Sequence, residues 1–177
     1  MRILDIFFSL VLCLILAIPL LIIILLIGPS PIFKQERIGL NNSRFILLKI
    51  RTMELNTTHE GQVYLDNNSI TKIGRILRRF KIDELPQLYN ILRGDMSIVG
   101  PRPLMDLQGI DEDLRMKRNS VRPGLTGLAQ ISGNIHLSLE QKILLDLKMI
   151  ESLNLRSYCF YILRTFSVVI LGEKLKK

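Results

Sequence analysis

The sequence predicts a mainly α-helical protein with a small β element, an α+β fold, in which a compact basic domain is attached to a membrane. Apolar and charged residues are segregated: no Asp, Glu, Lys, Arg or His occurs from Ile6 to Phe33, whereas residues 34–177 carry the whole net charge of +8. In the later segments, apolar residues mostly recur at helical spacing, and one segment alternates as a strand does. With 48% apolar residues, this distribution excludes a fully soluble protein, a disordered chain and a transporter with many membrane spans.

Residues 1–33 form the predicted membrane anchor. As one straight helix at about 1.5 Å per residue, Ile6 to Ile27 would just cover a hydrocarbon core of about 30 Å. Pro19 interrupts this helix, because it removes a backbone donor and clashes with the carbonyl four residues earlier. Two interpretations remain, a kinked transmembrane helix and a broken helix that enters and leaves on one face, and helix physics alone favours the kinked span. A cleaved signal peptide is disfavoured, because the apolar run is too long for one.

Residues 34–177 form the predicted cytoplasmic domain. Its basic character fits the membrane face where anionic lipids attract Lys and Arg. Cys13 and Cys159 lie in apolar stretches, which is not typical of a disulfide framework or a metal site. Residues 54–70 are polar and predict a surface loop, in which His59 has no companions at ligand spacing.

The first predicted element of this domain is a strand over residues 45–53. Its alternation places Phe45, Leu47, Lys49 and Arg51 on one face. Two cations therefore point the same way, and the simplest interpretation is a strand with a solvated basic edge.

Two helices are predicted next. Apolar residues at helical spacing over residues 73–80, with four cations around them, predict a basic amphipathic helix on the membrane surface. Pro86 is tolerated only in a first turn, so another helix is expected to begin near Asp83. Asp83 is then either a helix N-cap with Glu84 as a first-turn acid, or half of a functional pair. In so basic a setting both carboxylates should stay ionised, which suits a Mg²⁺ ligand or a nucleophile toward phosphorus.

Two loops place an arginine beside a proline. Arg102 lies in residues 94–103 and Arg122 in residues 121–127, and both loops contain glycine. Restricted backbone dihedrals hold such a side chain in place, and arginine binds phosphate bidentately. Together with Lys49, Arg51 and Arg78, these loops predict a site for a polyanionic ligand.

The C-terminal third predicts two helices. Apolar residues repeat at helical spacing from Leu139 to Leu153, with Asp146 at the edge of the stripe as a surface partner for Lys142 or Lys148. Tyr158 to Gly172 predicts a core helix or one lying in the lipid interface, too short for a second span.

Six motifs carry a resemblance to a known family. They are Gln35–Gly39, Phe45 with Lys49–Met53, Ile73–Arg78, Asp83–Gln87, Gly94–Pro103 and Val121–Gln130. In this order and spacing they resemble the bacterial sugar transferase family, the small monotopic phosphoglycosyl transferases that start glycan assembly on a polyprenyl phosphate. The resemblance covers nearly the whole chain.

The resemblance implies a reaction and its site. A sugar-1-phosphate would move from a UDP-sugar to undecaprenyl phosphate with release of UMP, as the first membrane step of a bacterial surface glycan. Asp83 would be the nucleophile that forms a phosphosugar-aspartyl intermediate, and Glu84 the second carboxylate, with Mg²⁺ at this pair. The substrate or phosphate contacts would be Lys49, Arg78, Arg102, Arg122 and Asp146.

The family also places its site on the cytoplasmic face of the bacterial inner membrane. Its anchor is a re-entrant hairpin broken at the proline, which moves the expectation for Pro19 toward entry and exit on one face. The chain departs from the family pattern at four positions, namely Ile18, Asn134, Met149 and Tyr158.

The alternative to an enzyme is a membrane-tethered basic module that binds nucleic acid or anionic lipid. Only 6% of the residues are aromatic, there is no Trp, and no nucleic-acid motif occurs, so no nucleic-acid partner is expected. Membrane lipid is an expected partner, and an exposed apolar helix leaves open a homo-oligomer. The sequence does not name the sugar, because pocket shape sets that specificity.

Overall fold

The computed structural model describes residues 1–54, 70–105, 109–133 and 136–171, and most of these residues are helical. The helices are α1 (Arg2–Ile27), α2 (Lys72–Arg79), α3 (Gln87–Arg93), α4 (Glu112–Asn119), α5 (Leu128–Ile131), α6 (Leu139–Ser152) and α7 (Leu155–Leu171). The strands are β1 (Ile32–Ile38), β2 (Arg44–Ile50), β3 (Ser97–Val99) and β4 (Gly124–Thr126), and η1 (Leu40–Asn42) and η3 (Ile82–Glu84) are 3₁₀ helices. The predicted fold class, mainly α with a small β element, is confirmed.

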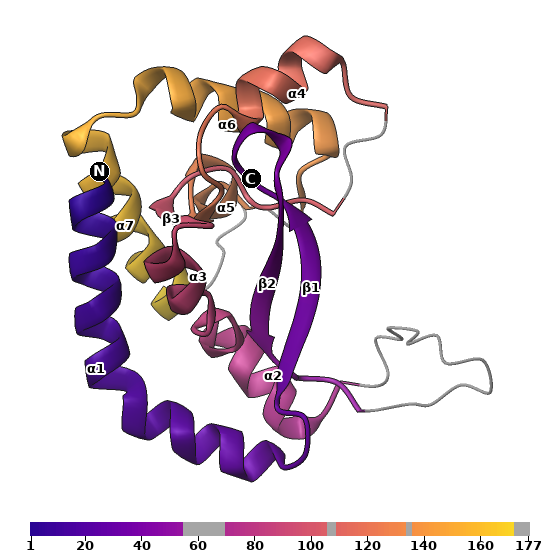
Figure 1. The fold of residues 1–177 in the computed structure, drawn as a ribbon, viewed down its shortest axis with the longest axis vertical. Helices are drawn as coiled ribbons and strands as arrows, with labels where there is room; N and C mark the ends of the chain where they lie inside the picture. The colour runs from indigo at the N-terminus through magenta and orange to yellow at the C-terminus, as the bar shows by residue number, and fades with distance from the viewer. Residues whose placement is uncertain (55–69, 106–108, 134–135, 172–177) are drawn as a thin grey trace.

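The larger β element is the antiparallel hairpin of β1 and β2, which stands beside the helices in Figure 1. The sequence predicted a strand over residues 45–53, which is β2 but ends three residues earlier, at Ile50, and it did not predict the partner β1. Phe33 lies opposite Lys49 and Arg37 opposite Phe45, so these side chains share one face of the hairpin. Phe45 and Leu47 are buried in the core, and the cations that follow them on the same face reach the site described below.

A second, parallel pair joins β3 to β4. Gly100 follows β3 directly, and a Cβ on Gly124 would lie 2.0 Å from its backbone nitrogen. Only glycine permits this approach of two backbones, so the two arginine-bearing loops lie against each other.

The other predicted helices are present with small shifts. The helix expected over residues 73–80 is α2, and the one expected from Leu139 to Leu153 is α6. The helix expected near Asp83 is divided into η3 and α3, with Pro86 at the α3 N-cap. α7 begins three residues before Tyr158, and its predicted end at Gly172 lies outside the described residues, as do Asn134, His59 and the predicted loop apart from its ends.

The anchor is one helix, α1, with Pro19 inside it. Figure 1 shows it passing alongside α3 and α7, bending, and then running toward the lower end of the hairpin. Arg2 near its start donates to the carbonyl oxygens of Ile91 (2.6 Å) and Leu92 (2.9 Å), at the end of α3. Arg51 donates to the carbonyl oxygen of Ile27, the last residue of α1, at 3.3 Å. Both ends of the anchor therefore contact the same domain.

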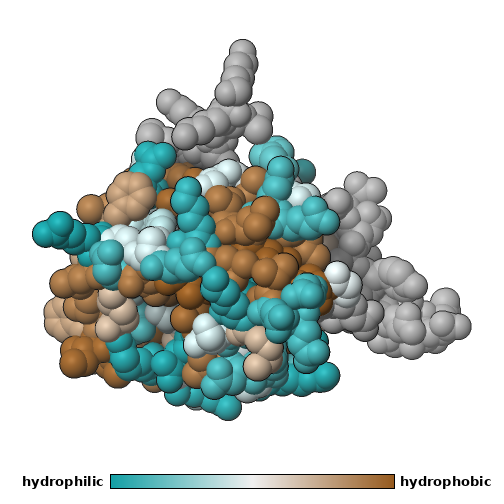
Figure 2. Space-filling model, turned by 90° about the horizontal axis from the view of Figure 1, so that it is seen from above, coloured by the Kyte–Doolittle hydropathy of each residue, from teal (hydrophilic) through white to brown (hydrophobic). Residues whose placement is uncertain are grey.

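One side of α1 packs on the domain core and the other is exposed. Leu4, Leu12 and Cys13 pack against core residues, whereas residues such as Leu14, Ile18 and Leu25 are each 72% exposed. Among the described residues, α1 is the one helix long and apolar enough to cross a membrane. α7 likewise buries two tyrosines and exposes apolar side chains. Figure 2 shows the molecule from above, and on this face apolar patches alternate with polar groups. The exposed side of α1 is instead made of apolar side chains.

Candidate active site

The main cavity has a volume of about 550 Å³ and lies between the hairpin and the segment from α2 to η3. Its charged lining residues are the cations Arg37, Lys49, Arg51, Arg78, Lys81 and Arg102 and the anions Glu54, Asp83 and Glu84. Cations outnumber anions in this lining by two to one. The cavity is therefore suited to an anionic ligand.

Asp83 and Glu84 lie in η3, between α2 and α3. Lys81 has a left-handed backbone conformation (φ 57°), which turns the chain sharply after α2. Both carboxylate residues are buried, with 8% of each exposed. Neither η3 nor α3 has a side-chain cap, so the N-cap interpretation of Asp83 is wrong. Its carboxylate lines the cavity instead.

Glu84 is held by two cations. Its Oε1 lies 3.1 Å from Nη2 of Arg102 and 3.6 Å from Nζ of Lys49. Burial alone would raise the pKa of Glu84, but Arg102, Lys49 and Lys81 together outweigh burial and hold that pKa below its ordinary value. Glu84 is therefore ionised, as the sequence predicted.

Asp83 is in a different electrostatic position. Burial first, and the neighbouring Glu84 second, raise the pKa of Asp83 above its ordinary value, although Lys49, Lys81 and Arg78 oppose them. No ion pair joins its carboxylate to another described residue. Two adjacent carboxylates thus differ, one neutralised by cations and the other open to the cavity.

Arg78 is fixed by Thr52, since its Nε donates to the Thr52 hydroxyl at 2.8 Å. Arg37 and Arg51 also line the cavity, and the sequence had not placed Arg37 there. Nε of Arg37 and Nη1 of Arg51 are buried without a hydrogen-bond partner among the described residues. Arg37 belongs to one of the recognised motifs, but its place at the cavity follows from pairing with β2, which the sequence did not predict.

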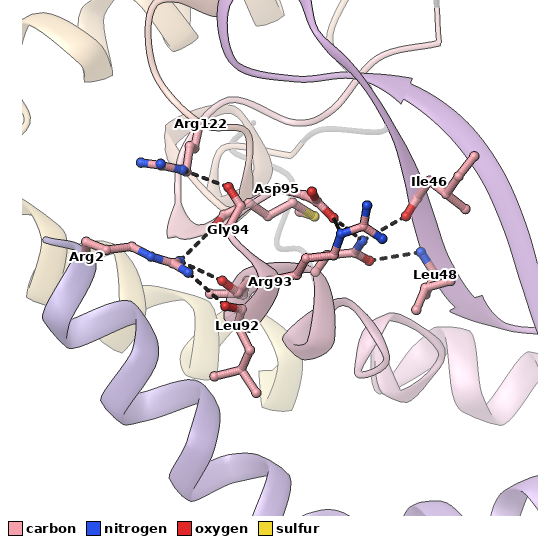
Figure 3. Close-up of polar contacts among 11 residues, drawn as sticks. Arg2, Ile46, Leu48, Leu92, Arg93, Gly94, Asp95 and Arg122 are labelled. Carbon is pink, nitrogen blue, oxygen red and sulfur yellow. Dashed lines mark hydrogen bonds and ion pairs between the residues drawn. The ribbon is translucent and has the colours of Figure 1, made fainter.

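Arg122 and Asp146 do not line the cavity, although both were predicted as substrate contacts. Arg122 donates from Nε to the carbonyl oxygen of Gly94 at 2.8 Å, as Figure 3 shows. Asp146 is 1% exposed and pairs with Arg118 at 2.9 Å, so its prediction as a surface partner of lysines is wrong. Arg118 in turn donates to the backbone carbonyl of Arg102 at 2.6 Å. Asp146 thus lies behind the site and reaches it only through Arg118.

Three of the four departures from the family pattern lie in the described residues. Ile18 is exposed on α1, and Met149 is fully buried in the core. The hydroxyl of Tyr158, also fully buried, donates to the Asp5 carboxylate at 2.7 Å. Met149 and Tyr158 therefore both belong to the packed core.

The described residues contain no group of three or more Asp, Glu, His or Cys side chains that could hold a metal ion. They do place two adjacent carboxylates in a cationic cavity. Mg²⁺ commonly takes one or two protein carboxylates and fills its other positions with water and substrate phosphates. Asp83 and Glu84 fit such a shared site, and do not fit a metal held by protein alone.

Asp146 predicts a pH dependence of stability. Burial raises its pKa from 3.8 to about 6, although Arg118 opposes this. The folded state therefore holds this proton more tightly than the unfolded chain. We expect the contribution of Asp146 to the free energy of unfolding to fall as pH rises from about 4 to 6, by at most about 3 kcal/mol.

The measurement is the unfolding midpoint of the wild type and of Asp146→Asn across this range. The wild type should lose stability relative to the variant as pH rises. A constant difference from pH 4 to 7 would show that the carboxyl group of Asp146 has an ordinary pKa.

An apolar anchor helix and a cationic cavity around two buried carboxylates define a membrane-associated domain with a site for an anionic ligand. Residues 1–172 match the bacterial sugar transferase family, and the chain belongs to this family.

Named relatives support this membership. The chain is 44% identical over 127 residues to the uncharacterized sugar transferase EpsL of Bacillus subtilis, covering 71% of this chain and 63% of that relative. It is 40% identical over 150 residues to a UDP-glucose:undecaprenyl-phosphate glucose-1-phosphate transferase of Caulobacter vibrioides, covering 78% and 55%. It is 38% identical over 117 residues to a UDP-N-acetylgalactosamine-undecaprenyl-phosphate N-acetylgalactosaminephosphotransferase of Aeromonas hydrophila, covering 62% and 28%. The chain spans less than two thirds of the length of each of these relatives.

Proposed function

We propose that this protein transfers a sugar-1-phosphate from a UDP-sugar to undecaprenyl phosphate and releases UMP. The observation that carries this proposal is the buried Asp83–Glu84 pair in a cavity lined by six cations. A UDP-sugar and a lipid phosphate are both polyanions, and relatives named above use such substrates. The product would be a lipid-linked sugar that starts a surface glycan such as an exopolysaccharide, a capsule, an O-antigen or a glycoprotein glycan.

The chemistry divides into two displacements at one phosphorus. A carboxylate oxygen of Asp83 attacks the sugar-linked phosphorus, the bond to the UMP oxygen breaks, and a phosphosugar-aspartyl intermediate forms. An oxygen of the lipid phosphate then attacks the same phosphorus and regenerates the Asp83 carboxylate. The open carboxylate of Asp83 suits this role, whereas Glu84 is already neutralised by Arg102 and Lys49.

The cations supply the electrostatic part of catalysis. Lys49 and Arg102 are oriented by Glu84, and Arg78 by Thr52, so little reorganisation is needed when phosphate enters. Arg37 and Arg51 also line the cavity, and their guanidinium groups can bind further phosphate oxygens. When bound at Asp83 and Glu84, Mg²⁺ would neutralise diphosphate charge.

The direct test is an assay of the full chain in detergent or nanodiscs with Mg²⁺, undecaprenyl phosphate and a panel of UDP-sugars. We expect at least one donor to give UMP together with a lipid product whose mass equals that of undecaprenyl phosphate plus the UDP-sugar minus UMP. UMP release without any lipid-linked sugar would contradict the proposed acceptor. Inactivity toward every donor would contradict the proposed reaction.

The anchor is proposed to enter and leave the membrane on the cytoplasmic face of the inner membrane. Arg2 and Ile27 lie near opposite ends of α1, yet both bind the catalytic domain. A straight span would place these ends on opposite sides of the bilayer, where one domain could not bind both. The bend at Pro19 removes this conflict.

This topology predicts the labelling of an engineered cysteine. Ile3 lies in the first turn of α1, beside Arg2, and entry and exit on one face keep this turn at the cytoplasmic surface; Ile3→Cys in a background without Cys13 and Cys159 should therefore react with an impermeant maleimide in inside-out vesicles but not in intact cells. Glu140→Cys on α6 is the matched control for the catalytic domain. Labelling of Ile3→Cys in intact cells, with Glu140→Cys protected, would refute entry and exit on one face.

A further inference from the structure

Asp5 is a carboxylate buried at the start of the apolar anchor. It is 2% exposed and is the one acidic residue of α1. Its two oxygens accept from the hydroxyl of Ser97 (2.9 and 3.0 Å), and its Oδ1 also accepts from the backbone N–H of Ile98 (2.8 Å) and the hydroxyl of Tyr158 (2.7 Å). A role in lipid anchoring alone does not explain a carboxylate that faces the domain.

These contacts must be specific, because burying a polar group without hydrogen-bond partners is strongly unfavourable. The nearby cation Arg2 does not pair with Asp5 and binds the carbonyl oxygens at the end of α3 instead, as Figure 3 shows. Asp5 is therefore satisfied by neutral donors of two elements, β3 and α7. These hydrogen bonds therefore tie the first turns of α1 to both elements.

The segment that Asp5 holds leads directly to the site. Ser97 and Ile98 belong to β3, and the chain continues from β3 to Arg102, which pairs with Glu84 at 3.1 Å. On the other flank, Arg2 binds the end of α3, whose beginning follows Glu84 by three residues. The first turns of α1 thus support both sides of the Glu84–Arg102 pair.

We propose that Asp5 is a positioning residue of the active site, acting through β3 to place Arg102 against Glu84. The proposal rests on the function proposed above and extends it to the anchor. The N-terminal arm of α1 then has two tasks: its outer side contacts lipid, and its inner side fixes the geometry that binds the donor diphosphate.

The test uses Asp5→Ala, with Ser9→Ala as the matched control. Ser9 lies one turn further along the same buried side of α1, and its hydroxyl has no partner among the described residues. We expect Asp5→Ala to lower kcat by about 10- to 100-fold, the range expected for a displacement of about 1 Å at a catalytic group. Ser9→Ala should retain wild-type kcat, and both variants should stay in the membrane fraction.

A double-mutant cycle with Arg102→Ala separates positioning from general stability. If Asp5 acts through Arg102, the Asp5→Ala/Arg102→Ala variant is no slower than Arg102→Ala alone. Tyr158→Phe removes one donor and keeps the other contacts, so it should show the same coupling with a smaller loss even if Asp5→Ala folds poorly. Independent, multiplicative losses would overturn the proposal, and so would wild-type kcat in Asp5→Ala.

Calorimetric measurement of UDP binding tests the positioning role of Asp5 without measuring catalysis. Asp5→Ala and Arg102→Ala should weaken UDP binding by similar factors, with no further loss when combined. Coupled UDP binding in a protein inactive toward all donors would refute the proposed reaction and leave the positioning role supported. Unchanged UDP affinity in Asp5→Ala, with Arg102→Ala weakened, would overturn the positioning role alone.

Discussion

Replacement of Asp83 by asparagine is expected to lower the rate of UMP release by about 10³-fold or more, because the attacking oxygen of a covalent mechanism is lost. The asparagine side chain keeps the size of the aspartate, so the cavity and the Glu84 contacts should remain. The measurement is UMP release from the donor that serves the wild type, with and without undecaprenyl phosphate. Wild-type protein should also gain the mass of the phosphosugar on the peptide that contains Asp83 when the acceptor is omitted.

Two further variants make this result specific. Asp113→Asn, an exposed first-turn acid of α4, is the matched control and should retain full activity. Glu84→Gln should slow the reaction but still form the adduct, because it disturbs Lys49 and Arg102 rather than the nucleophile. An adduct on Glu84, or normal UMP release by Asp83→Asn, would disprove the assignment of Asp83.

Replacement of Arg118 by methionine is expected to destabilise the fold by about 3 kcal/mol, the lower end of what breaking a buried ion pair costs. Arg118 is 3% exposed and donates both to Asp146 and to the backbone carbonyl of Arg102. Its removal leaves Asp146 buried without its ion-pair partner, and one oxygen of Asp146 already lacks a hydrogen-bond partner among the described residues. For a protein of this size, such a loss lowers the unfolding midpoint by about 6–12 °C.

The double variant Arg118→Met/Asp146→Leu separates stability from activity. Apolar residues of similar volume often replace a buried ion pair without loss, so this variant should recover most of the unfolding midpoint. It should remain slow, because no donor then fixes the carbonyl of Arg102. Recovery of both stability and kcat would show that Arg118 does not position Arg102.

Much of the fold was predictable because the signals are local. Helical apolar spacing indicated α2 and α6 to within one residue, a long apolar stretch indicated α7, and alternation indicated β2. β1 was missed because its sequence is mixed and its strand conformation depends on pairing with β2. The sharp turn between α2 and η3 was also missed, since its left-handed residue is Lys81 and no glycine signals it.

The site was predictable in part for the same reason. Asp83, Glu84, Lys49, Arg78 and Arg102 line one cavity, as their clustering in motifs suggested. Arg122 and Asp146 occupy equally conspicuous positions but bind protein groups behind the cavity. A motif reports that a side chain is required and does not report whether it faces ligand or backbone.

The sequence by itself determined the segregation of apolar from charged residues and the fold class, because hydropathy and periodicity depend on near neighbours in the chain, and it placed Asp83 next to Glu84. The tertiary structure decided the rest. It determined which cations face Asp83, that Arg118 supports the loop of Arg102, and that Asp5 in α1 binds β3 and α7. These contacts join residues tens of positions apart or more, and only the folded chain brings such residues within hydrogen-bond distance.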